Sequence, residues 1–509
     1  MRGALAPWET PVNTTVKTDW HARAATLAPR SGVFIEGRFR AAASGATFDC
    51  ISPIDGRVIA KVAAGDAADV DLAVASSRAA FERGDWSRRA PRERKQVLLR
   101  FADLLRAHRE ELALTETLDM GKPIGDSLAV DVPSSANCIQ WYAEAIDKIY
   151  DEVAPTGPDS LALVRREPLG VVGAVVPWNF PMIMASWKIG PILAAGNSLV
   201  LKPSEKSPLT ALAMAELAVE AGLPPGVFNV VPGFGHTAGK ALAEHMDVDG
   251  IGFTGSTATG KLIMGYAAQS NLKRVSLECG GKSPNIVMAD YRDVERAARA
   301  AAYAIFFNQG EMCSAGSRFV VHESLKDALL EEVAKVAREL APGDPLDEAT
   351  KLGAIVDAQQ MQRVLGYIEA GKADGARLAL GGQRVRGDSG GCFIEPTVFE
   401  GVKPSMRIAR EEIFGPVLST ITFRDEAEAI VIANDTQYGL AAAVWTRDLS
   451  TAHRMARAIR AGMVYVNCYD ADDITVPFGG FRQSGMGRDK SLHAFDKFTE
   501  LKTTWIALS

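Results

Sequence analysis

The sequence has little cysteine and no long apolar run, and each shortage excludes a class of protein. No stretch approaches the ~18 uninterrupted apolar residues that a membrane-spanning helix needs, so we expect no membrane partner. Six cysteines lie far apart, at positions 50, 138, 279, 313, 392 and 468, without the spacing of paired metal ligands or a disulfide framework. We therefore expect no metal, and a reducing cytoplasm as the compartment.

An excess of positive charge is also missing. The 56 Lys and Arg residues face 62 Asp and Glu residues, for a formal net charge of −6 over 509 residues. Because nucleic-acid binding needs a basic patch or stripe, we expect no nucleic-acid partner. The stretch "MRGALAPWETPVNTTVKTDW" (1–20) has no apolar core, which is atypical of a secretory or organelle signal.

What the sequence does contain is an alternation of apolar runs and helical patterns. The runs at 170–179, 197–204 and 226–233 have the composition of buried strands. Between the last two, 207–226 has helical spacing, with Ser207 as a cap and Pro208 at the first helical position. The same rhythm resumes after residue 281. This alternation predicts an α/β fold with two parallel-sheet domains that join near 277–284. The helical spacing of apolar residues within 91–121 predicts one long helix.

The segment 150–168 departs from this rhythm because it is charged, alternating and interrupted by proline. We expect a hairpin that leaves the main domain and exposes an edge that finds a partner. The apolar tail "FTELKTTWIALS" (498–509) is a candidate for pairing with it. Such an edge suggests oligomerisation.

One cysteine, Cys313, stands in "FFNQGEMCSAGSR" (306–318), between two glycines and among small residues. A buried cysteine commonly serves as a small apolar side chain. A thiol can also be a nucleophile. These residues alone leave both interpretations open.

Two glycine-containing turns are candidates for a phosphate site. In "GFGHTAG" the glycines at 233, 235 and 239 are spaced one residue too far for the dinucleotide fingerprint, so an ordinary turn between strand and helix explains them better. In "GFTGSTATGK" (252–261), Gly255 and Ser256 open a helix whose free N–H groups and dipole would hold a phosphate. A helix cap that binds nothing is the alternative.

Lys202 and Glu205 follow the strand in "LVLKPSEKSP" (199–208), at the end where open α/β sheets bind ligands. Glu205 is placed to accept both ribose hydroxyls of an adenosine. Its charge would repel a 2′-phosphate, which favours NAD over NADP. A solvated charged loop is the alternative.

Seven motifs stand in the order that resembles the aldehyde dehydrogenase superfamily, from about residue 34 to the C-terminus. They are "PWNFP" (177–181), "KPSE" (202–205), "GFTGST" (252–257), "LECGGKSP" (277–284), "FNQGEMCSAGSR" (307–318), "EEIFGPV" (411–417) and "PFGGFRQSGMGR" (477–488). The resemblance implies two Rossmann-like parallel-sheet domains plus a small β element for oligomerisation. It also implies a small-molecule aldehyde as substrate, NAD as cofactor with NADP less favoured, and a homo-oligomer, either a dimer or a tetramer.

The resemblance also divides the chain. Residues 1–149 and 169–280 are implied to form an NAD-binding domain, and 281–481 a catalytic domain. Residues 150–168 and 482–509 are implied to form the oligomerisation or bridging element. This division is an expectation from the family pattern.

Matched by motif position, Cys313 is the nucleophile, Glu278 the general base, Asn179 the oxyanion donor, and Lys188 a lysine near the catalytic centre. The positions implied to contact the cofactor are Val176, Pro177, Trp178, Lys202, Glu205, Gly235, Gly239, Phe253, Gly255, Ser256, Gln360, Glu412 and Phe414. Cys279 departs from the family pattern, because many relatives carry leucine there.

The implied roles are chemically consistent. A free aldehyde carbonyl is a poor hydride donor, whereas the oxyanion formed by thiolate attack expels hydride and leaves a thioester. A carboxylate base then activates water to hydrolyse that thioester. A free thiol has a pKa near ~8.5, so a cationic neighbour must raise the thiolate fraction, and we expect Lys188 to contribute.

Within the superfamily, the chain is most similar to bacterial dehydrogenases of γ-glutamyl-γ-aminobutyraldehyde and related ω-amino or guanidino aldehydes, which act in putrescine or arginine breakdown. "WYAEAIDKIYDEVAPTG" (141–157) and "NQGEMCSAGSR" carry this resemblance. Asp470, Asp472 and Asp473 would receive a cationic tail, and Asp131 is expected nearby. The tunnel would be lined by Phe180, Trp187 and Phe307.

Several alternatives stay open. One alternative is that the aspartates form a solvated acidic loop of a broad-specificity or aromatic aldehyde dehydrogenase, for example one acting on indole-3-acetaldehyde. A thiol hydrolase would need a histidine base, and the seven histidines fall in no such motif. A CoA-acylating enzyme would not need Glu278. A non-catalytic NAD-binding protein is disfavoured by intact Cys313, Glu278 and Asn179.

Overall fold

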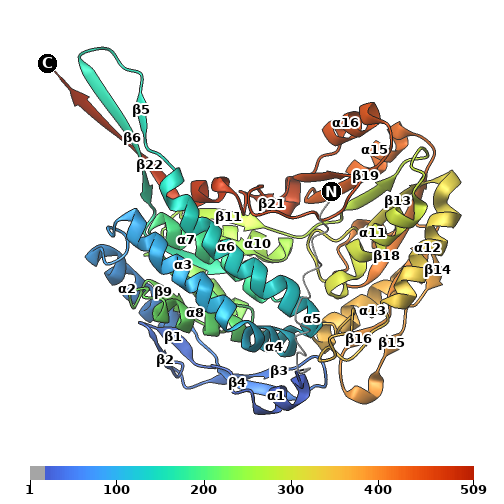
Figure 1. The fold of residues 1–509 in the computed structure, drawn as a ribbon, viewed down its shortest axis with the longest axis horizontal. Helices are drawn as coiled ribbons and strands as arrows, with labels where there is room; N and C mark the ends of the chain where they lie inside the picture. Colours follow the sequence, from blue (N-terminus) through green and yellow to red (C-terminus); the bar gives the residue numbers. More distant parts are fainter. Residues whose placement is uncertain (1–17, 509) are drawn as a thin grey trace, which may run out of the picture.

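A computed structural model describes residues 18–508. Two β-sheets form the centres of two halves, and an arm of strands leaves the first half (Figure 1). The strands form where the sequence has short valine-rich runs, and helices between them cover the sheets, as the alternation predicts. The prediction of an α/β fold is confirmed.

The first sheet has the strand order β2–β1–β9–β8–β7–β10–β11–β21. Its strands, in chain order, are β1 Val33–Ile35, β2 Arg38–Arg40, β7 Val171–Val175, β8 Ser198–Lys202, β9 Phe228–Val230, β10 Gly250–Thr254, β11 Arg274–Glu278 and β21 Gly485–Met486. The five strands from β9 to β11 run parallel, and antiparallel strands flank them on both sides. The carboxyl ends of the parallel strands therefore share one edge.

Both faces of this sheet are covered, because alternate side chains of a strand point to opposite faces. Val171 and Val175 pack with one group of helices, and Val172 and Ala174 pack with the other. The first group is α2 Ala67–Arg83, α9 Lys240–Glu244 and α10 Thr257–Gln269. The second is α3 Pro91–Ala107, α4 Arg109–Met120, α6 Val132–Ala145, α7 Pro181–Ala195 and α8 Leu209–Glu220.

The second sheet has the order β14–β17–β18–β13–β12–β19–β20, and all its pairs are parallel except β14 with β17. Its strands are β12 Pro284–Val287, β13 Arg318–His322, β14 Arg377–Leu380, β17 Thr397–Glu400, β18 Val417–Phe423, β19 Ala441–Trp445 and β20 Met463–Val466. The covering helices are α11 Val294–Phe306 and α12 Lys326–Glu339 on one face, with α13 Ala358–Ala373, α14 Arg407–Arg410, α15 Glu426–Asn434 and α16 Leu449–Ala458 on the other.

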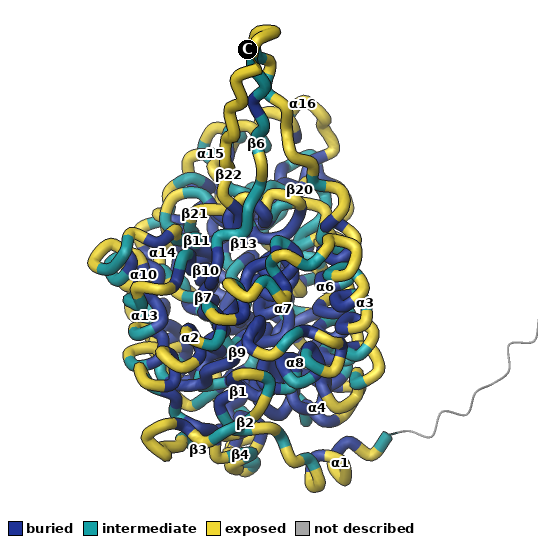
Figure 2. The backbone as a smooth tube through the Cα atoms, turned by 90° about the vertical axis from the view of Figure 1, so that its left-hand side faces the viewer, coloured by how far each residue is buried: buried dark blue, intermediate teal, exposed yellow. Residues whose placement is uncertain are grey.

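A three-stranded arm projects from the first half (Figures 1 and 2). It consists of β5 Glu152–Ala154, β6 Ser160–Pro168 and β22 Thr499–Ala507. The predicted hairpin is confirmed, and the tail pairs antiparallel with β6 from Thr499 opposite Pro168 to Ala507 opposite Ser160. The arm leaves large apolar side chains in solvent, including Tyr150 at 79% exposure and Trp505 at 64%.

Short elements complete the described chain: α1 Trp20–Thr26, α5 Ile124–Asp126, β3 Thr47–Ile51 paired with β4 Val58–Ala63, and β15 Arg384–Val385 paired with β16 Phe393–Ile394. None of the helices in residues 18–508 is long and apolar enough to cross a membrane. The quoted N-terminal stretch lies mostly outside the described residues.

The prediction of one long helix within 91–121 is wrong in one respect. The backbone of His108 (φ −94°, ψ 22°) leaves the helical range, so α3 ends and α4 begins around it. The apolar residues on both sides keep helical spacing, which is why the break leaves no trace in the pattern. Gly121 ends α4 with φ 92°, a left-handed conformation that glycine adopts without strain.

Candidate active site

Cys313 follows α11 and a short 3₁₀ turn, Phe307–Gly310. Inside this turn Asn308 (φ 48°) and Gln309 (φ 57°) adopt left-handed backbone, at a cost of about 1–3 kcal/mol each. Their side-chain amides secure it: Asn308 Nδ2 donates to the Asn179 carbonyl at 3.0 Å, and Gln309 Oε1 accepts from the Gly353 N–H at 2.9 Å. The turn therefore holds the thiol against the segment that carries Asn179.

Two cavities meet at Cys313. The first, which we call the glutamate cavity, has a volume of about 190 Å³ and contains Glu278 and Glu412 in its lining. The second, which we call the aromatic cavity, has a volume of about 430 Å³ and contains Phe307 and Trp187 in its lining. Phe180, Met184 and Cys313 line both. A molecule in either cavity can thus reach the same sulfur atom.

The surroundings of Cys313 favour the neutral thiol. Burial raises its pKa well above the usual range, and the charges of Glu278, Glu412 and Asp470 raise it further. The expectation that Lys188 supplies the balancing cation is not met, because Lys188 Nζ donates to Asp489 Oδ2 at 2.5 Å. A base next to the sulfur therefore promotes thiolate formation.

Glu278 is the carboxylate placed for that task. It ends β11, and among the described residues neither of its oxygens has a hydrogen-bond partner. Burial, followed by the charge of Asp489, raises its pKa to about 8, while Lys188 acts in the opposite direction. A buried, unpartnered carboxyl of this pKa can accept a proton near neutral pH.

Asn179 comes after β7, in the loop that leads into α7. Its side chain is 4% exposed, and Nδ2 donates to the Glu311 carbonyl at 2.8 Å. An amide nitrogen carries two N–H donors, so one remains available to the cavity. Asn179 lines the glutamate cavity together with Cys313.

Glu412 faces the same cavity from the second half. Its Oε1 accepts from the Gly281 N–H at 3.0 Å, and burial raises its pKa to about 7. A Cβ atom at Gly280 would lie 2.2 Å from Glu412 Oε2, so the glycine leaves room for this carboxyl. Phe414 packs edge-on against Trp178 at 5.2 Å between ring centroids, and its carbonyl accepts from Gln360 Nε2 at 2.7 Å.

The remaining residues expected at the cofactor lie at the carboxyl edge of the first sheet. Lys202 and Glu205 form an ion pair of 3.1 Å. Burial lowers the pKa of Lys202. Burial also opposes the charged form of Glu205, but the Lys202 charge, hydrogen bonds and the Lys206 charge together outweigh it and lower the Glu205 pKa. Ser256 caps α10, with Oγ accepting from the Thr259 N–H at 3.2 Å.

Some of these positions flank the cavity without lining it. The Val176 N–H donates to the Lys202 carbonyl at 3.2 Å. Phe253 is a core residue, and its ring lies 2.6 Å from where a Cβ at Gly255 would stand. The residues expected at the cofactor that line the glutamate cavity are Pro177, Trp178, Gly255, Ser256, Gln360, Glu412 and Phe414. Gly235 and Gly239 bound a one-turn π-helix, and a Cβ at Gly239 would contact Lys202 Cδ at 3.9 Å.

The aromatic cavity brings together six of the seven expected substrate residues: Phe180, Trp187, Phe307, Asp470, Asp472 and Asp473. The prediction that Asp131 lies near the substrate is wrong. This residue is fully buried, pairs with the buried Lys122, and is absent from the lining of both cavities. A carboxylate with an internal cation as its partner is satisfied inside the protein, so Asp131 is no substrate contact.

Sequence reasoning missed several residues of the site. Lys490 lines the aromatic cavity, and Asp489 accepts from both Lys188 and Lys497. Asp489 and Lys490 directly follow the "PFGGFRQSGMGR" motif, and this position is the one feature of the sequence that could have identified them as site residues. Cys279 packs against Gly260, and burial raises its pKa to about 12, which suits a structural thiol.

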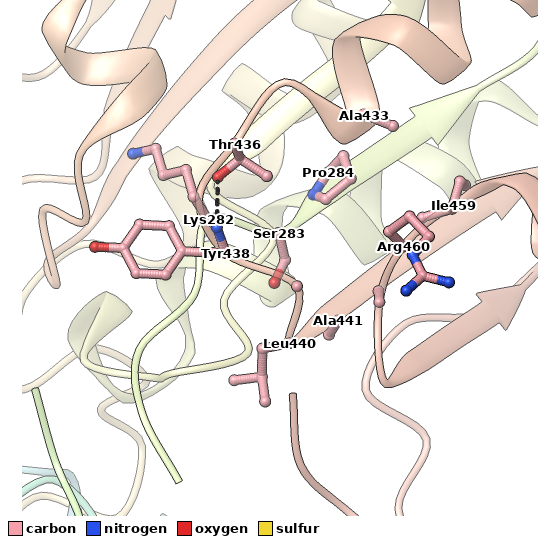
Figure 3. Close-up of a pocket in the computed structure, with 12 residues that line it drawn as sticks. Lys282, Ser283, Pro284, Ala433, Thr436, Tyr438, Leu440, Ala441, Ile459 and Arg460 are labelled. Atoms are coloured by element: carbon pink, nitrogen blue, oxygen red, sulfur yellow. Dashed lines mark hydrogen bonds between the residues drawn. The ribbon is translucent and has the colours of Figure 1, made fainter. Parts of the chain in front are cut away.

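A further small hollow lies beside the start of β12. Lys282, Thr436 and Arg460 are among its lining residues, and the Tyr438 N–H donates to Thr436 Oγ1 at 3.2 Å (Figure 3). Figure 3 shows Lys282 extending away from Arg460. The volume of about 10 Å³ accommodates roughly one water molecule, so the hollow is too small for an organic ligand.

A thiol at the junction of two cavities, between two α/β halves, suits an oxidoreductase that brings a nucleotide and a small substrate to one sulfur. Residues 39–504 match the aldehyde dehydrogenase family. The chain belongs to the aldehyde dehydrogenase family.

Individual relatives agree over almost the whole chain. The NADP/NAD-dependent aldehyde dehydrogenase PuuC of Escherichia coli (strain K12) is 54% identical over 489 residues, which cover 96% of this chain and 98% of that protein. The structure of γ-glutamyl-γ-aminobutyraldehyde dehydrogenase from Burkholderia cenocepacia J2315 matches with a TM-score of 0.95 and 62% identity, covering 96% of this chain and 99% of that one.

A third relative points to another substrate. The structure of P. syringae AldA, an indole-3-acetaldehyde dehydrogenase, matches with a TM-score of 0.96 and 63% identity, covering 96% of this chain and 99% of that one. The predictions of the family, of its α/β fold and of aldehyde oxidation are confirmed by these comparisons. The two substrates named among the relatives are the two that the sequence left open.

Proposed function

We propose that the protein oxidises an aldehyde whose tail carries a cation: an ω-amino, guanidino or γ-glutamylamino aldehyde of polyamine or arginine breakdown. The observation that carries this proposal is the set of three carboxylates, Asp470, Asp472 and Asp473, in the lining of the aromatic cavity. The side chain of Asp472 is 62% exposed, so it meets solvent at the cavity mouth. The B. cenocepacia γ-glutamyl-γ-aminobutyraldehyde dehydrogenase supports this substrate class.

In the proposed mechanism Glu278 removes the thiol proton, and Cys313 sulfur attacks the aldehyde carbonyl from the aromatic cavity. The free Asn179 N–H and the backbone N–H of Cys313 stabilise the oxyanion of the thiohemiacetal; losing one such donor costs about 3 kcal/mol. Departure of hydride leaves a thioester on Cys313. After Glu278 has passed the thiol proton to solvent, its carboxylate takes a proton from water, and that water attacks the thioester and releases the acid and the Cys313 thiolate.

NAD is the cofactor, and the glutamate cavity fits it. Gly280 has no Cβ and therefore leaves space for the Glu412 carboxyl. Helix α10 begins beside the cavity, with Ser256 as its cap. We propose that the N-terminus of α10 holds the pyrophosphate, Glu205 the adenosine ribose, and Glu412 the nicotinamide ribose. When bound, NAD accepts the hydride.

An aromatic aldehyde is a second candidate substrate, and a specific observation favours it. Phe180, Trp187, Phe307 and Phe478 line the same cavity, and the Trp187 and Phe478 rings lie 5.2 Å apart. Such walls accommodate a flat apolar ring. The relation to P. syringae AldA supports this candidate.

A panel of aldehydes separates the two candidates. The rate of NADH formation is measured for 4-guanidinobutyraldehyde, γ-glutamyl-γ-aminobutyraldehyde, hexanal, benzaldehyde and indole-3-acetaldehyde. A lead in kcat/KM for the charged tails supports the proposal. Equal or faster turnover of the apolar aldehydes would assign the aspartates to solvent.

Glu205→Gln is expected to raise the ratio of kcat/KM with NADP to that with NAD about tenfold, because the neutral amide no longer repels a 2′-phosphate. The measurement is steady-state kinetics with each cofactor at one fixed aldehyde concentration. Glu152→Gln, on the exposed β5, is the matched control. A ratio equal to that of the wild type would contradict the ribose assignment.

The dependence of kcat/KM on pH is expected to follow the ionisation of the Glu278 carboxyl. Its pKa of about 8 means that roughly one molecule in a hundred carries the base form at pH 6. We therefore expect kcat/KM to rise about tenfold per pH unit from pH 6 and to level off above about pH 8. Initial rates at low aldehyde concentration measure the profile. A flat profile between pH 6 and 8 would contradict Glu278 as the base.

The arm supports a proposal on assembly. We propose that β5, β6 and β22 form an oligomerisation element of a cytoplasmic homodimer or homotetramer, because exposed side chains such as Trp505 and Leu501 favour burial against another subunit. In the same proposal, residues 1–149 and 169–280 bind the cofactor, 281–481 form the catalytic domain, and 150–168 with 482–509 bridge subunits.

A further inference from the structure

Lys490 occupies an unusual position in the aromatic cavity. Its side chain is 1% exposed, yet it lines the cavity. The backbone at Lys490 is left-handed (φ 63°), as is that of the next residue, Ser491 (φ 49°). The cavity therefore contains a buried cation on a strained segment, opposite the aspartates proposed to attract a substrate cation.

The Lys490 ammonium fills a place that suits a cationic ligand. Nζ lies 5.6 Å from the ring centroid of Trp187 and 5.9 Å from that of Phe478, within the range of cation–π attraction. It also donates to Asp472 at the cavity mouth. Two aromatic rings and a carboxylate are thus already engaged by a cation of the protein itself.

The other two aspartates of the cavity are engaged differently. Asp470 Oδ1 accepts from Ser314 Oγ at 3.0 Å, next to the catalytic thiol. Asp473 Oδ1 accepts from the Thr475 N–H at 2.8 Å and from its hydroxyl at 2.6 Å. Neither is neutralised by an ion pair in the described part of the chain, so both carboxylates stay available to a positive group.

The Lys490 ammonium has more N–H donors than acceptors within the described residues. An ammonium carries three N–H donors, and within residues 18–508 Asp472 is the one acceptor recorded for Nζ. A buried charged group with unused donors favours a ligand oxygen, most strongly a carboxylate. Lys490 can therefore bind a carboxylate of a ligand in this cavity, and Asp470 and Asp473 can bind a cation of the same ligand.

We propose that Lys490 is a specificity-determining residue that binds a carboxylate on the substrate tail. The protein then prefers aldehydes whose tail carries both a carboxylate and a cation over aldehydes that carry a cation alone. This inference rests on the proposed function, because it assumes that the charged tail enters the aromatic cavity. Lys490 also keeps Asp472 from pairing with a purely cationic tail.

The test compares wild type with Lys490→Met on three aldehydes: γ-glutamyl-γ-aminobutyraldehyde (both charges), 4-guanidinobutyraldehyde (a cation alone) and hexanal (neutral). The measured quantity is the ratio of kcat/KM for the first aldehyde to that for the second. We expect the substitution to lower this ratio about tenfold or more, because the carboxylate loses its partner and Asp472 is freed for the guanidinium. Hexanal turnover reports whether the variant is catalytically competent.

Two further variants keep the proposal testable if Lys490→Met does not fold. Lys490→Arg retains the cation and is expected to keep the ratio within about threefold of the wild type. Asp472→Asn removes a carboxylate but leaves the Lys490 charge, so the ratio is expected to rise. A fall of the ratio in Asp472→Asn would overturn the proposal.

The outcomes separate this inference from the proposed function. Wild type that turns over hexanal faster than both charged aldehydes would overturn the proposed function, and the inference with it. A preference for charged tails whose ratio is the same in wild type and Lys490→Met would overturn the inference alone. A lowered ratio in Lys490→Met, retained in Lys490→Arg, supports it.

Discussion

Cys313→Ala is expected to lower kcat for aldehyde oxidation on the order of 10⁴-fold or more, while the Kd for NAD stays within about threefold of the wild type. The thiol supplies the only covalent step, so its loss leaves a carbonyl that cannot release hydride. The glutamate cavity keeps Trp178, Ser256, Glu412 and Phe414, which are the proposed cofactor contacts. NADH formation measures the first quantity, and a fluorescence titration with NAD measures the second.

Cys279→Ala is the matched control. Cys279 is a neighbouring thiol that burial keeps protonated, with a pKa of about 12, and it packs in the core. Its removal is expected to leave oxidation within a few-fold of the wild type. Turnover by Cys313→Ala near the wild-type rate, or loss of activity only in Cys279→Ala, would contradict the assignment of the nucleophile.

Glu278→Gln is expected to slow steady-state turnover about 10²- to 10³-fold and to trap the acyl-enzyme. Glutamine keeps the shape of the side chain but cannot accept a proton from water, so the thioester persists. Some hydride transfer remains, because a fraction of the thiol ionises without the base. Intact mass spectrometry after mixing with NAD and hexanal measures the mass added to the protein.

The matched control for this experiment is Glu152→Gln, which removes an exposed carboxylate of the arm. It is expected to show no accumulated acyl group, as in the wild type. If Glu278→Gln turns over slowly but carries no added acyl mass, water activation is not its role. A variant that turns over at the wild-type rate would remove Glu278 from the mechanism altogether.

Much of the fold and of the catalytic set could be predicted from the sequence, because both depend on local patterns. Runs such as "VVGAVV", short and rich in β-branched residues, are typical of buried strands, and β7 forms within that run. Parallel strands end at one edge, so Asn179, Lys202 and Glu278, each at or just after a strand end, converge there. Their convergence on one cavity system follows from topology.

Other features depend on tertiary contacts that leave no local pattern. The left-handed Asn308 and Gln309 carry no glycine signal, since side-chain amides compensate their backbone cost. Asp131 was expected near the substrate, but Lys122 pairs with it in the interior, and no local pattern announces that contact. Lys490 was overlooked because nothing in sequence shows that Trp187 and Phe478 lie beside its ammonium.

The most direct test of the central claim is to locate the trapped acyl group. Glu278→Gln is mixed with NAD and hexanal, quenched in acid, digested and mapped by tandem mass spectrometry. The account predicts one hexanoyl group, on Cys313 in the peptide that contains "GEMCSAG", and only when NAD is present. An acyl group on Cys279 or another residue, or its absence while NADH forms, would contradict oxidation through a Cys313 thioester.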